Sequence, residues 1–296
     1  MSTGNIRERF LTIMSTRLYT QLEPQETLDL HDELERYLRA GDPSISEAQN
    51  LSLIEMLFYL SVYLGYDVNA QVLYGTLRDR LGERSPRLYV MNATLKQINE
   101  SDPEAIAYLE KLLAEEYEFD SDPATYGLIA KKLLAIKWEL ARAAGQSTDE
   151  LMRELVALIE KLPLDPELWW YLGDLYVQQG RLPEAKYCFE EVVLIMPFNY
   201  VAFARLAEVQ YYAALREKDA KKDAMLQEAL NYALRAVELS GLYLKGWSFV
   251  AVTAQLLQGK DKVLALAVAK LKEISKVSNS NDRKAALHIL ASKKLA

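Results

Sequence analysis

Hydrophobic and polar positions follow one another along most of this chain with the period of an α-helix. The clearest stretch covers residues 166–197, where apolar side chains recur three or four residues apart in two blocks separated by Gly180. Pro166 opens the first block and Pro197 follows the second. Proline is tolerated at the first position of a helix but not inside one. The pattern therefore predicts two consecutive helices joined by a tight turn at Gly180.

The spacing within this helix pair resembles the tetratricopeptide repeat, a helix–turn–helix unit of about 34 residues. When Pro166 is counted as position 1, eight residues match the repeat at positions 4, 7, 8, 11, 15, 20, 24 and 32. They are Trp169, Leu172, Gly173, Tyr176, Gly180, Ala185, Phe189 and Pro197. Position 27 departs from the repeat, because Val192 stands where a small residue is usual.

Helix packing explains why these residue types occur at these positions. Trp169, Leu172 and Tyr176 share one face of the first helix, and we expect Trp169 to be buried between the two helices. Gly173 and Ala185 are small, which lets the two helices cross closely. The eight-position match therefore predicts a packed helix pair.

Weaker copies of the pattern cover most of the remaining chain. We expect further helix pairs at residues 51–81, 88–117, 123–162, 203–236 and 247–276. Two of them carry extra residues, around 143–148 and 216–225, which we interpret as irregular insertions. The first forty residues suggest an irregular leading pair, and the tail from residue 282 suggests a short helix or frayed end.

No clear linker separates these units. We therefore predict a single all-α domain over residues 1–296, a tetratricopeptide-repeat right-handed superhelix, or α-solenoid, of about six helix pairs. Residues 1–48 would form an irregular N-terminal cap, 49–276 the repeats, and 277–296 a C-terminal helix or tail.

Composition and charge argue against some classes of function. The 296 residues include only 12 Gly and 9 Pro, as expected for long regular helices, and the formal net charge is −7. An acidic balance argues against nucleic-acid binding, which needs a basic face. The longest apolar run, residues 53–66, is interrupted by Glu55 and is shorter than the ~20 residues that span a bilayer. We expect a soluble protein in the cytosol or on the cytosolic side of a membrane.

Residues for catalysis or metal binding are sparse. The chain has one cysteine, Cys188, and two histidines, His31 and His288. No disulfide within the chain is possible, and no pair of residues has metal-ligand spacing. We expect Cys188 to be a small buried residue of the second helix. The sequence therefore predicts no catalytic residue, no metal and no cofactor.

The inner surface of the repeats is the better candidate for function. First-helix positions 2, 5, 9, 12 and 13 face this surface in tetratricopeptide repeats. The candidate protein-binding residues there are Trp170, Asp174, Gln178, Glu208, Tyr211, Tyr212 and Lys131. The repeat gives Trp170 no packing role, and with Tyr211 and Tyr212 it resembles a peptide-binding strip. The alternative is that Trp170 packs against a neighbouring unit.

A more specific resemblance rests on residues 164–200 and on three short sequence segments. The segments are residues 77–82 (Leu-Arg-Asp-Arg-Leu-Gly), 130–133 (Ala-Lys-Lys-Leu) and 239–247 (Leu-Ser-Gly-Leu-Tyr-Leu-Lys-Gly-Trp). They resemble the family of subunit 2 of the endoplasmic reticulum membrane protein complex, its fungal members most closely. The resemblance covers nearly the whole length.

The resemblance implies a non-catalytic cytosolic scaffold, held peripherally on the cytoplasmic face of the endoplasmic reticulum through protein partners. It implies contacts with the other subunits, notably the tail of subunit 5 and subunit 3. The complex of this family inserts tail-anchored and multispanning membrane proteins. A tetratricopeptide co-chaperone or a generic adaptor is the alternative, and an enzyme is a distant third. The inner positions argue against the co-chaperone, because Trp170 and Asp174 stand where a carboxylate clamp has Lys and Asn.

Overall fold

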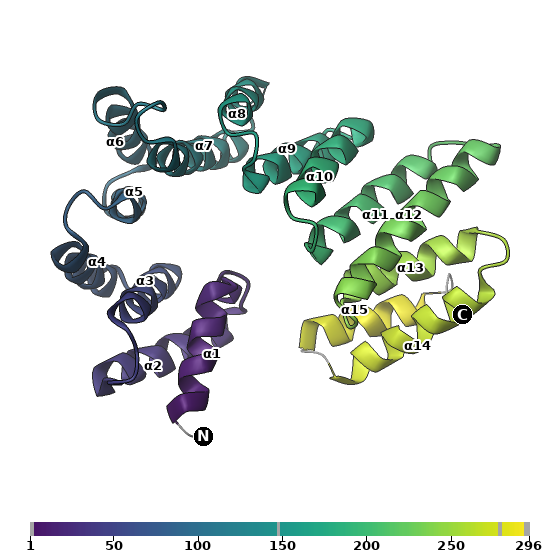
Figure 1. Cartoon of the computed structure of the whole chain (residues 1–296), viewed down its shortest axis with the longest axis horizontal. Coiled ribbons are helices and arrows are strands. Elements are labelled where there is room, and N and C mark those ends of the chain that lie inside the picture. Colours follow the sequence, from purple (N-terminus) through teal and green to yellow (C-terminus); the bar gives the residue numbers. More distant parts are fainter. Residues whose placement is uncertain (1–2, 147–148, 278–279, 293–296) are drawn as a thin grey trace. The chain divides into compact units, whose positions relative to one another are not determined.

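The computed structural model describes residues 3–146, 149–277 and 280–292. Over these residues the chain forms fifteen α-helices and one short 3-10 helix, and no strand occurs among them. Within each described range, short connections join consecutive helices (Figure 1). The prediction of an all-α fold is confirmed.

The chain divides into two compact units, Met1–Leu151 and Met152–Ala296. The helices of the first unit are α1 (Thr3–Ser15), η1 (Leu18–Thr20), α2 (Pro24–Ala40), α3 (Glu47–Tyr63), α4 (Asp67–Leu81), α5 (Pro86–Asn99), α6 (Asp102–Glu115) and α7 (Pro123–Ala143). Consecutive helices pack against each other from α2 to α7, and α1 packs on α3.

The boundary between the units falls in the first turn of α8 (Asp149–Lys161). The helices that follow are α9 (Pro166–Gln178), α10 (Leu182–Ile195), α11 (Tyr200–Ala214), α12 (Asp219–Leu239), α13 (Leu244–Leu256), α14 (Asp261–Val277) and α15 (Ser280–Ala291). Each helix from α9 to α14 packs on the next, and α11 also packs on α13.

Local sequence explains where these helices begin. The Asp165 carboxylate accepts hydrogen bonds from the backbone N–H groups of Glu167 and Leu168 at the start of α9, at 2.9 and 3.4 Å. Asn199 caps α11 in the same way through the N–H groups of Val201 and Ala202, both at 3.1 Å. Such caps satisfy backbone donors that have no partner within the helix. Matching caps at the two inter-repeat turns therefore set the same entry into successive repeats.

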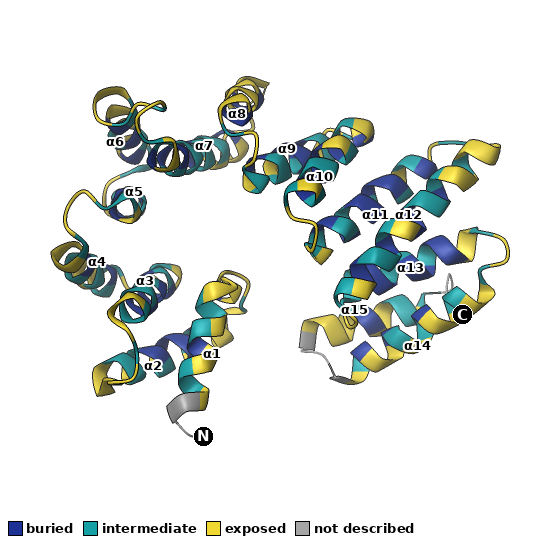
Figure 2. Cartoon of the chain, in the orientation of Figure 1, coloured by how far each residue is buried: buried dark blue, intermediate teal, exposed yellow. Residues whose placement is uncertain are grey.

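The buried side chains lie on the helix faces that meet neighbouring helices (Figure 2). In the second unit, one cluster joins Phe189 of α10 to Leu206 of α11, and another joins Trp247 of α13 to Leu271 of α14. The cores thus run from helix to helix, as expected for stacked repeats.

Two helix-interior glycines mark close crossings. A Cβ at Gly173 would lie 2.9 Å from Cζ of Phe189, and one at Gly246 would lie 2.7 Å from Cγ1 of Val237. Any larger side chain would have to displace these neighbours or push the helices apart. The predicted reason for a small residue at Gly173 is therefore correct.

Six consecutive helix pairs run from α3 to α14 in chain order, as the sequence predicts. The expectation of irregular insertions is wrong in part. Residues 219–225 add turns to the start of α12, and α7 extends to Ala143, so that both helices have 21 residues. Residues 144–146 and 216–218 lie outside these helices, and residues 147–148 of the first predicted insertion lie outside the described residues. Good helix formers such as Ala and Lys explain why the added residues are helical. The organisation as one solenoid over 1–296 stays a prediction.

Candidate protein-interaction surfaces

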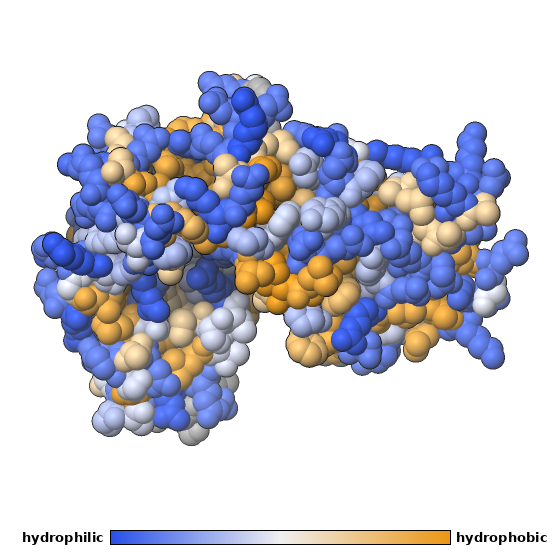
Figure 3. Space-filling model, turned by 45° about the horizontal axis from the view of Figure 1, so that its top comes forward, coloured by the Kyte–Doolittle hydropathy of each residue, from blue (hydrophilic) through white to orange (hydrophobic). Residues whose placement is uncertain are grey.

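The surface carries several hydrophobic patches among mostly hydrophilic side chains (Figure 3). Two surfaces of the second unit bear on function. One is formed by the first helices of successive repeats, α9, α11 and α13, and is called the first-helix strip below. The other is an apolar groove between α8, α9 and α10.

Trp170 lies on the first-helix strip, but it is packed within the chain. Its ring meets the edge of Phe189 with ring centroids 5.3 Å apart, and it joins the cluster around Leu206. Trp170 is half-buried as a result. Trp170 thus packs both within its own repeat, on Phe189, and against the cluster that includes Leu206 of the next repeat. Its role in binding stays a prediction.

A network of charges connects the three helices of the strip. The guanidinium of Arg205 on α11 donates to the carboxylates of Asp174 on α9 and Glu208 on α11. Nζ of Lys245 on α13 lies 2.6 Å from Oε2 of Glu208. Two of the predicted candidates, Asp174 and Glu208, are thus brought together by cations from neighbouring repeats.

Arg205 is the centre of this network and is largely enclosed. Its side chain is only 17% exposed and lies over the ring of Phe189 at 5.3 Å. Burial lowers the pKa of Arg205, but the carboxylates of Asp174 and Glu208 outweigh that effect and raise it. Because both acids already face this permanent cation, their charge is compensated within the chain. The network suits a role in fixing neighbouring repeats rather than capture of a basic ligand.

The outer part of the strip is more accessible. Tyr211 is half-buried between Tyr212 and Phe249, with ring centroids 5.4 and 5.8 Å away, and burial raises the pKa of its hydroxyl. Tyr212 is 50% exposed, and Gln178 on α9 is also exposed. The residues of the strip that can meet a partner directly are therefore Tyr212 and Gln178.

The remaining candidate, Lys131, lies on α7 in the first unit. It is half-buried there. The strip described above consists of residues of the second unit alone.

Sequence reasoning missed Arg205, Lys245 and Phe249. Lys245 is at position 2 of the α13 repeat, so the inner-position rule would have found it if applied to that weaker repeat. Arg205 and Phe249 both occupy position 6, which the rule does not count as inner. A cation at position 6 next to acids at position 9 of its own and the preceding repeat is the signal that could have found the network.

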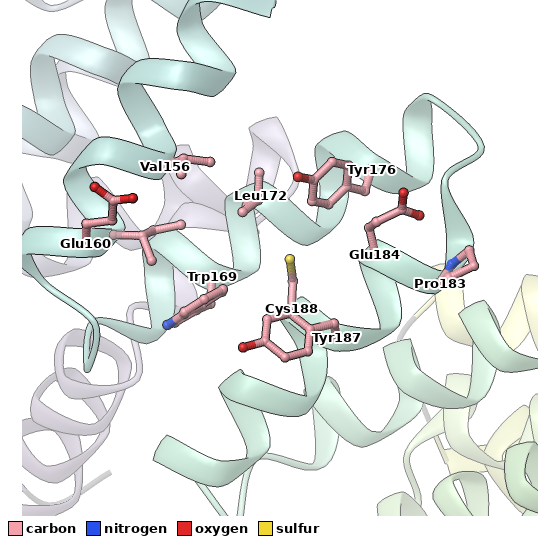
Figure 4. A pocket seen from close by; sticks show the side chains of 10 residues that line it. Val156, Glu160, Trp169, Leu172, Tyr176, Pro183, Glu184, Tyr187 and Cys188 are labelled. Carbon is pink, nitrogen blue, oxygen red and sulfur yellow. The ribbon is translucent and has the colours of Figure 1, made fainter.

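The second surface is a groove with a volume of about 470 Å³ (Figure 4). Helix α8 contributes Val156, Ile159 and Glu160, α9 contributes Trp169, Leu172 and Tyr176, and α10 contributes Pro183, Glu184, Tyr187 and Cys188. Its lining is mostly apolar, with glutamates from α8 and α10. The volume lies within the usual range of binding pockets, roughly 300–1,000 Å³.

Trp169 forms one end of this groove and is only half-buried. The expectation that it is fully buried between the two helices is therefore wrong. Its Nε1 donates to the carbonyl oxygen of Pro163 at 2.8 Å, and its ring meets Tyr187 at 5.8 Å. At the other end, Arg181 lies 4.5 Å from the ring of Tyr176 and donates to Glu184. Trp169 thus leaves one side uncovered where the groove opens.

Cys188 lies in the middle of the groove lining but is only 1% exposed. Burial raises the pKa of its thiol to about 12. A thiol with this pKa is a neutral, unreactive group at physiological pH. The prediction of a small buried residue is confirmed at this position.

The described residues hold no cluster of three or more His, Cys, Asp or Glu side chains suited to a metal ion. His31 is buried against Ser61 and Asn69 in the first unit, with Nε2 3.3 Å from the Ser61 hydroxyl. Across the described part of the chain, no helix has both the length and the apolar character needed to cross a membrane.

The fold and the repeat signature define the class of protein. Residues 166–199 match the family model of the tetratricopeptide repeat. Two solved structures show the same fold at low sequence identity. The C-terminal part of a TPR repeat-containing protein from Cytophaga hutchinsonii aligns with a TM-score of 0.51 and 14% identity, covering 96% of this chain and 99% of that one. A signal-transduction ATPase with a tetratricopeptide-repeat sensor from Pyrococcus horikoshii aligns with a TM-score of 0.55 and 16% identity, covering 98% and 44%. The chain is a tetratricopeptide-repeat protein.

Closer relatives narrow the class to one family. ER membrane protein complex subunit 2 of Saccharomyces cerevisiae is 48% identical over 94% of this chain and 95% of its own length. TPR repeat protein oca3 of Schizosaccharomyces pombe is 28% identical over 86% and 81%. The Dictyostelium discoideum ER membrane protein complex subunit 2 is 23% identical over 81% and 74%. This chain belongs to the family of subunit 2 of the ER membrane protein complex.

Proposed function

We propose that this chain is a non-catalytic scaffold subunit of the ER membrane protein complex. It would be held at the cytoplasmic face of the endoplasmic reticulum by protein contacts and would support insertion of tail-anchored and multispanning membrane proteins. The observation that carries the proposal is 48% identity to the S. cerevisiae subunit over nearly the whole of both chains.

The structure supports a scaffold through the Arg205 network, which ties α9, α11 and α13 together. A surface whose helices are fixed in this way is ordered before a partner arrives, and it therefore loses less entropy on binding. The first-helix strip is our candidate for contact with the other subunits, including the tail of subunit 5 and subunit 3.

The residues at the inner positions do not favour the co-chaperone alternative. A clamp for a C-terminal carboxylate needs cationic and amide side chains turned toward the ligand. Here position 5 is occupied by Trp170 and by Ala204, which is fully buried, and the acids at position 9 are paired with Arg205. An apolar and aromatic contact with a protein segment fits the strip better.

Membership of the complex is tested by purification of the tagged chain from its own cells. In mild detergent we expect the chain to bring down the membrane subunits in comparable amounts. Alkaline carbonate should release it from membranes, because protein contacts alone would hold it there. A chain that stays soluble and brings down no membrane subunit would contradict the proposal.

The role of the strip needs a variant that spares the fold. Trp170 and Tyr211 are unsuitable, because both pack within the chain. Replacing exposed Tyr212 and Gln178 together with Ala should leave melting unchanged but reduce recovery of the membrane subunits several-fold. Tyr171→Ala is the matched control, since Tyr171 is 54% exposed on α9 and does not belong to the strip. Equal recovery with both variants would remove the strip as the docking surface.

A further inference from the structure

The groove beside Trp169 has a feature that the first-helix strip lacks, namely an open apolar wall next to an uncompensated charge. Val156 and Tyr187 on its lining are 37% and 54% exposed. A concave, mostly apolar lining of this kind is typical of sites that accept apolar side chains. The groove therefore suits an occupant with large apolar side chains.

The charges of the rim define the occupant further. The negative charge of Glu184 is compensated within the chain, because Nε and a terminal nitrogen of Arg181 both donate to its Oε1, at 3.0 and 2.9 Å. Glu160 lies on α8, one helical turn after Val156, and pairs with no cation among the described residues. Among the lining residues, the uncompensated negative charge is thus that of Glu160, on the α8 side.

We propose that the groove between α8, α9 and α10 binds a basic-flanked apolar segment of a partner protein. One or two large apolar side chains enter between Trp169 and Tyr176, against Leu172. A Lys or Arg close to them in the partner sequence pairs with Glu160. Because Glu160 is exposed, this ion pair selects the charge and orientation of the partner segment more than it adds affinity. The site is separate from the strip, because the neighbouring residues Trp169 and Trp170 pack on different side chains of α10, Tyr187 and Phe189.

This inference rests on the proposed function in one respect, because it takes the occupant to be a protein met during assembly or work of the complex. The two can fail separately. If the chain brings down the membrane subunits but nothing enters the groove, only this inference is overturned. If the chain brings down no membrane subunit, the proposed function fails whatever the groove binds.

Site-specific photo-crosslinking in cells tests the groove directly. The full chain would carry p-benzoylphenylalanine in place of Tyr187, whose 54% exposure leaves room for the larger side chain. The matched control places it at Leu266 on α14, which is 51% exposed and outside the groove. We expect one strong protein adduct from position 187 that is absent from position 266. Mass spectrometry of the adduct should find apolar residues with Lys or Arg within about four positions.

The charge is tested with a fluorescent synthetic peptide that copies the cross-linked segment. Glu160→Lys should weaken its binding at least about tenfold, and Glu160→Gln by a smaller factor. Glu238→Lys, an exposed charge change on α12, should leave affinity unchanged. The inference is overturned by the absence of an adduct at position 187, by an adduct with lipid or a second copy of this chain, or by equal affinity of Glu160→Lys and Glu238→Lys.

Discussion

Two tryptophans occupy the same position in different repeats of the second unit and have different surroundings. Trp169 on α9 and Trp247 on α13 both donate Nε1–H to a carbonyl six residues earlier, that of Pro163 and that of Gly241, each at 2.8 Å. Trp247 is only 6% exposed, whereas Trp169 is half-buried beside the groove. The hydrogen bond belongs to the repeat position, but the burial does not.

The neighbouring helices account for the difference. The cluster of Trp247 includes Val237 from the preceding helix α12, Ile274 from α14 and Ala286 from α15. Around Trp169, α8 and α10 form the two walls of an open groove instead. The tryptophan of one repeat completes a core, whereas that of the other is partly exposed in the groove. We therefore expect Trp247 to contribute more than Trp169 to the free energy of unfolding, and Trp169 to be the residue that a partner could contact.

Replacing Trp247 with Ala should have the largest effect on stability. Removal of a buried tryptophan leaves a cavity and an unpaired carbonyl, and it typically costs about 3–5 kcal/mol. Urea unfolding followed by circular dichroism would measure the loss. A cost below about 1 kcal/mol would mean that Trp247 does not hold α12, α13 and α14 together.

Trp169→Ala should cost less, about 1–2 kcal/mol, because part of the ring already contacts water. The same unfolding experiment compares the two variants under one condition. Equal costs would contradict the comparison, since they would place both rings in equivalent cores. A near-zero cost would mean that the contact with Tyr187 and the bond to Pro163 contribute nothing.

Cys188 gives the smallest and most local test. Although it lies in the groove lining, its burial and its pKa near 12 should make alkylation by iodoacetamide at pH 8 at least about a hundredfold slower than in the urea-unfolded chain. Because the folded pKa is raised, the reactive thiolate should become common only as pH rises toward 12. Fast alkylation of the folded chain would show that the groove reaches deeper than its lining indicates.

The sequence was most informative where one residue type is required by contact with a known neighbour. Gly173, Ala185 and Phe189 could be placed in a packed pair because the close crossing admits few alternatives. The length of α7 and α12 could not, because extra residues with high helix propensity look the same whether they extend a helix or form a loop. The inner-position rule located Asp174 and Glu208 on one surface.

The inner-position rule could not predict whether those side chains are paired with other residues or exposed to solvent. Pairing of Asp174 and Glu208 depends on Arg205 and Lys245, which come from other repeats and become neighbours only when the helices stack. The exposure of Trp169 depends in the same way on how closely α8 approaches. Contacts between repeats are long-range in sequence, and a pattern within one repeat does not encode them.

The central claim, that this chain is a scaffold subunit of the ER membrane protein complex, is tested most directly by substitution in S. cerevisiae. The chain would replace the 48% identical subunit 2, and the complex would be purified through a tag on a membrane subunit. We predict that the chain is recovered with the complex in amounts equal to the tagged subunit, and that levels of a tail-anchored protein return to normal. Recovery of the complex without the chain, while the chain is present and folded in the cytosol, would contradict the account.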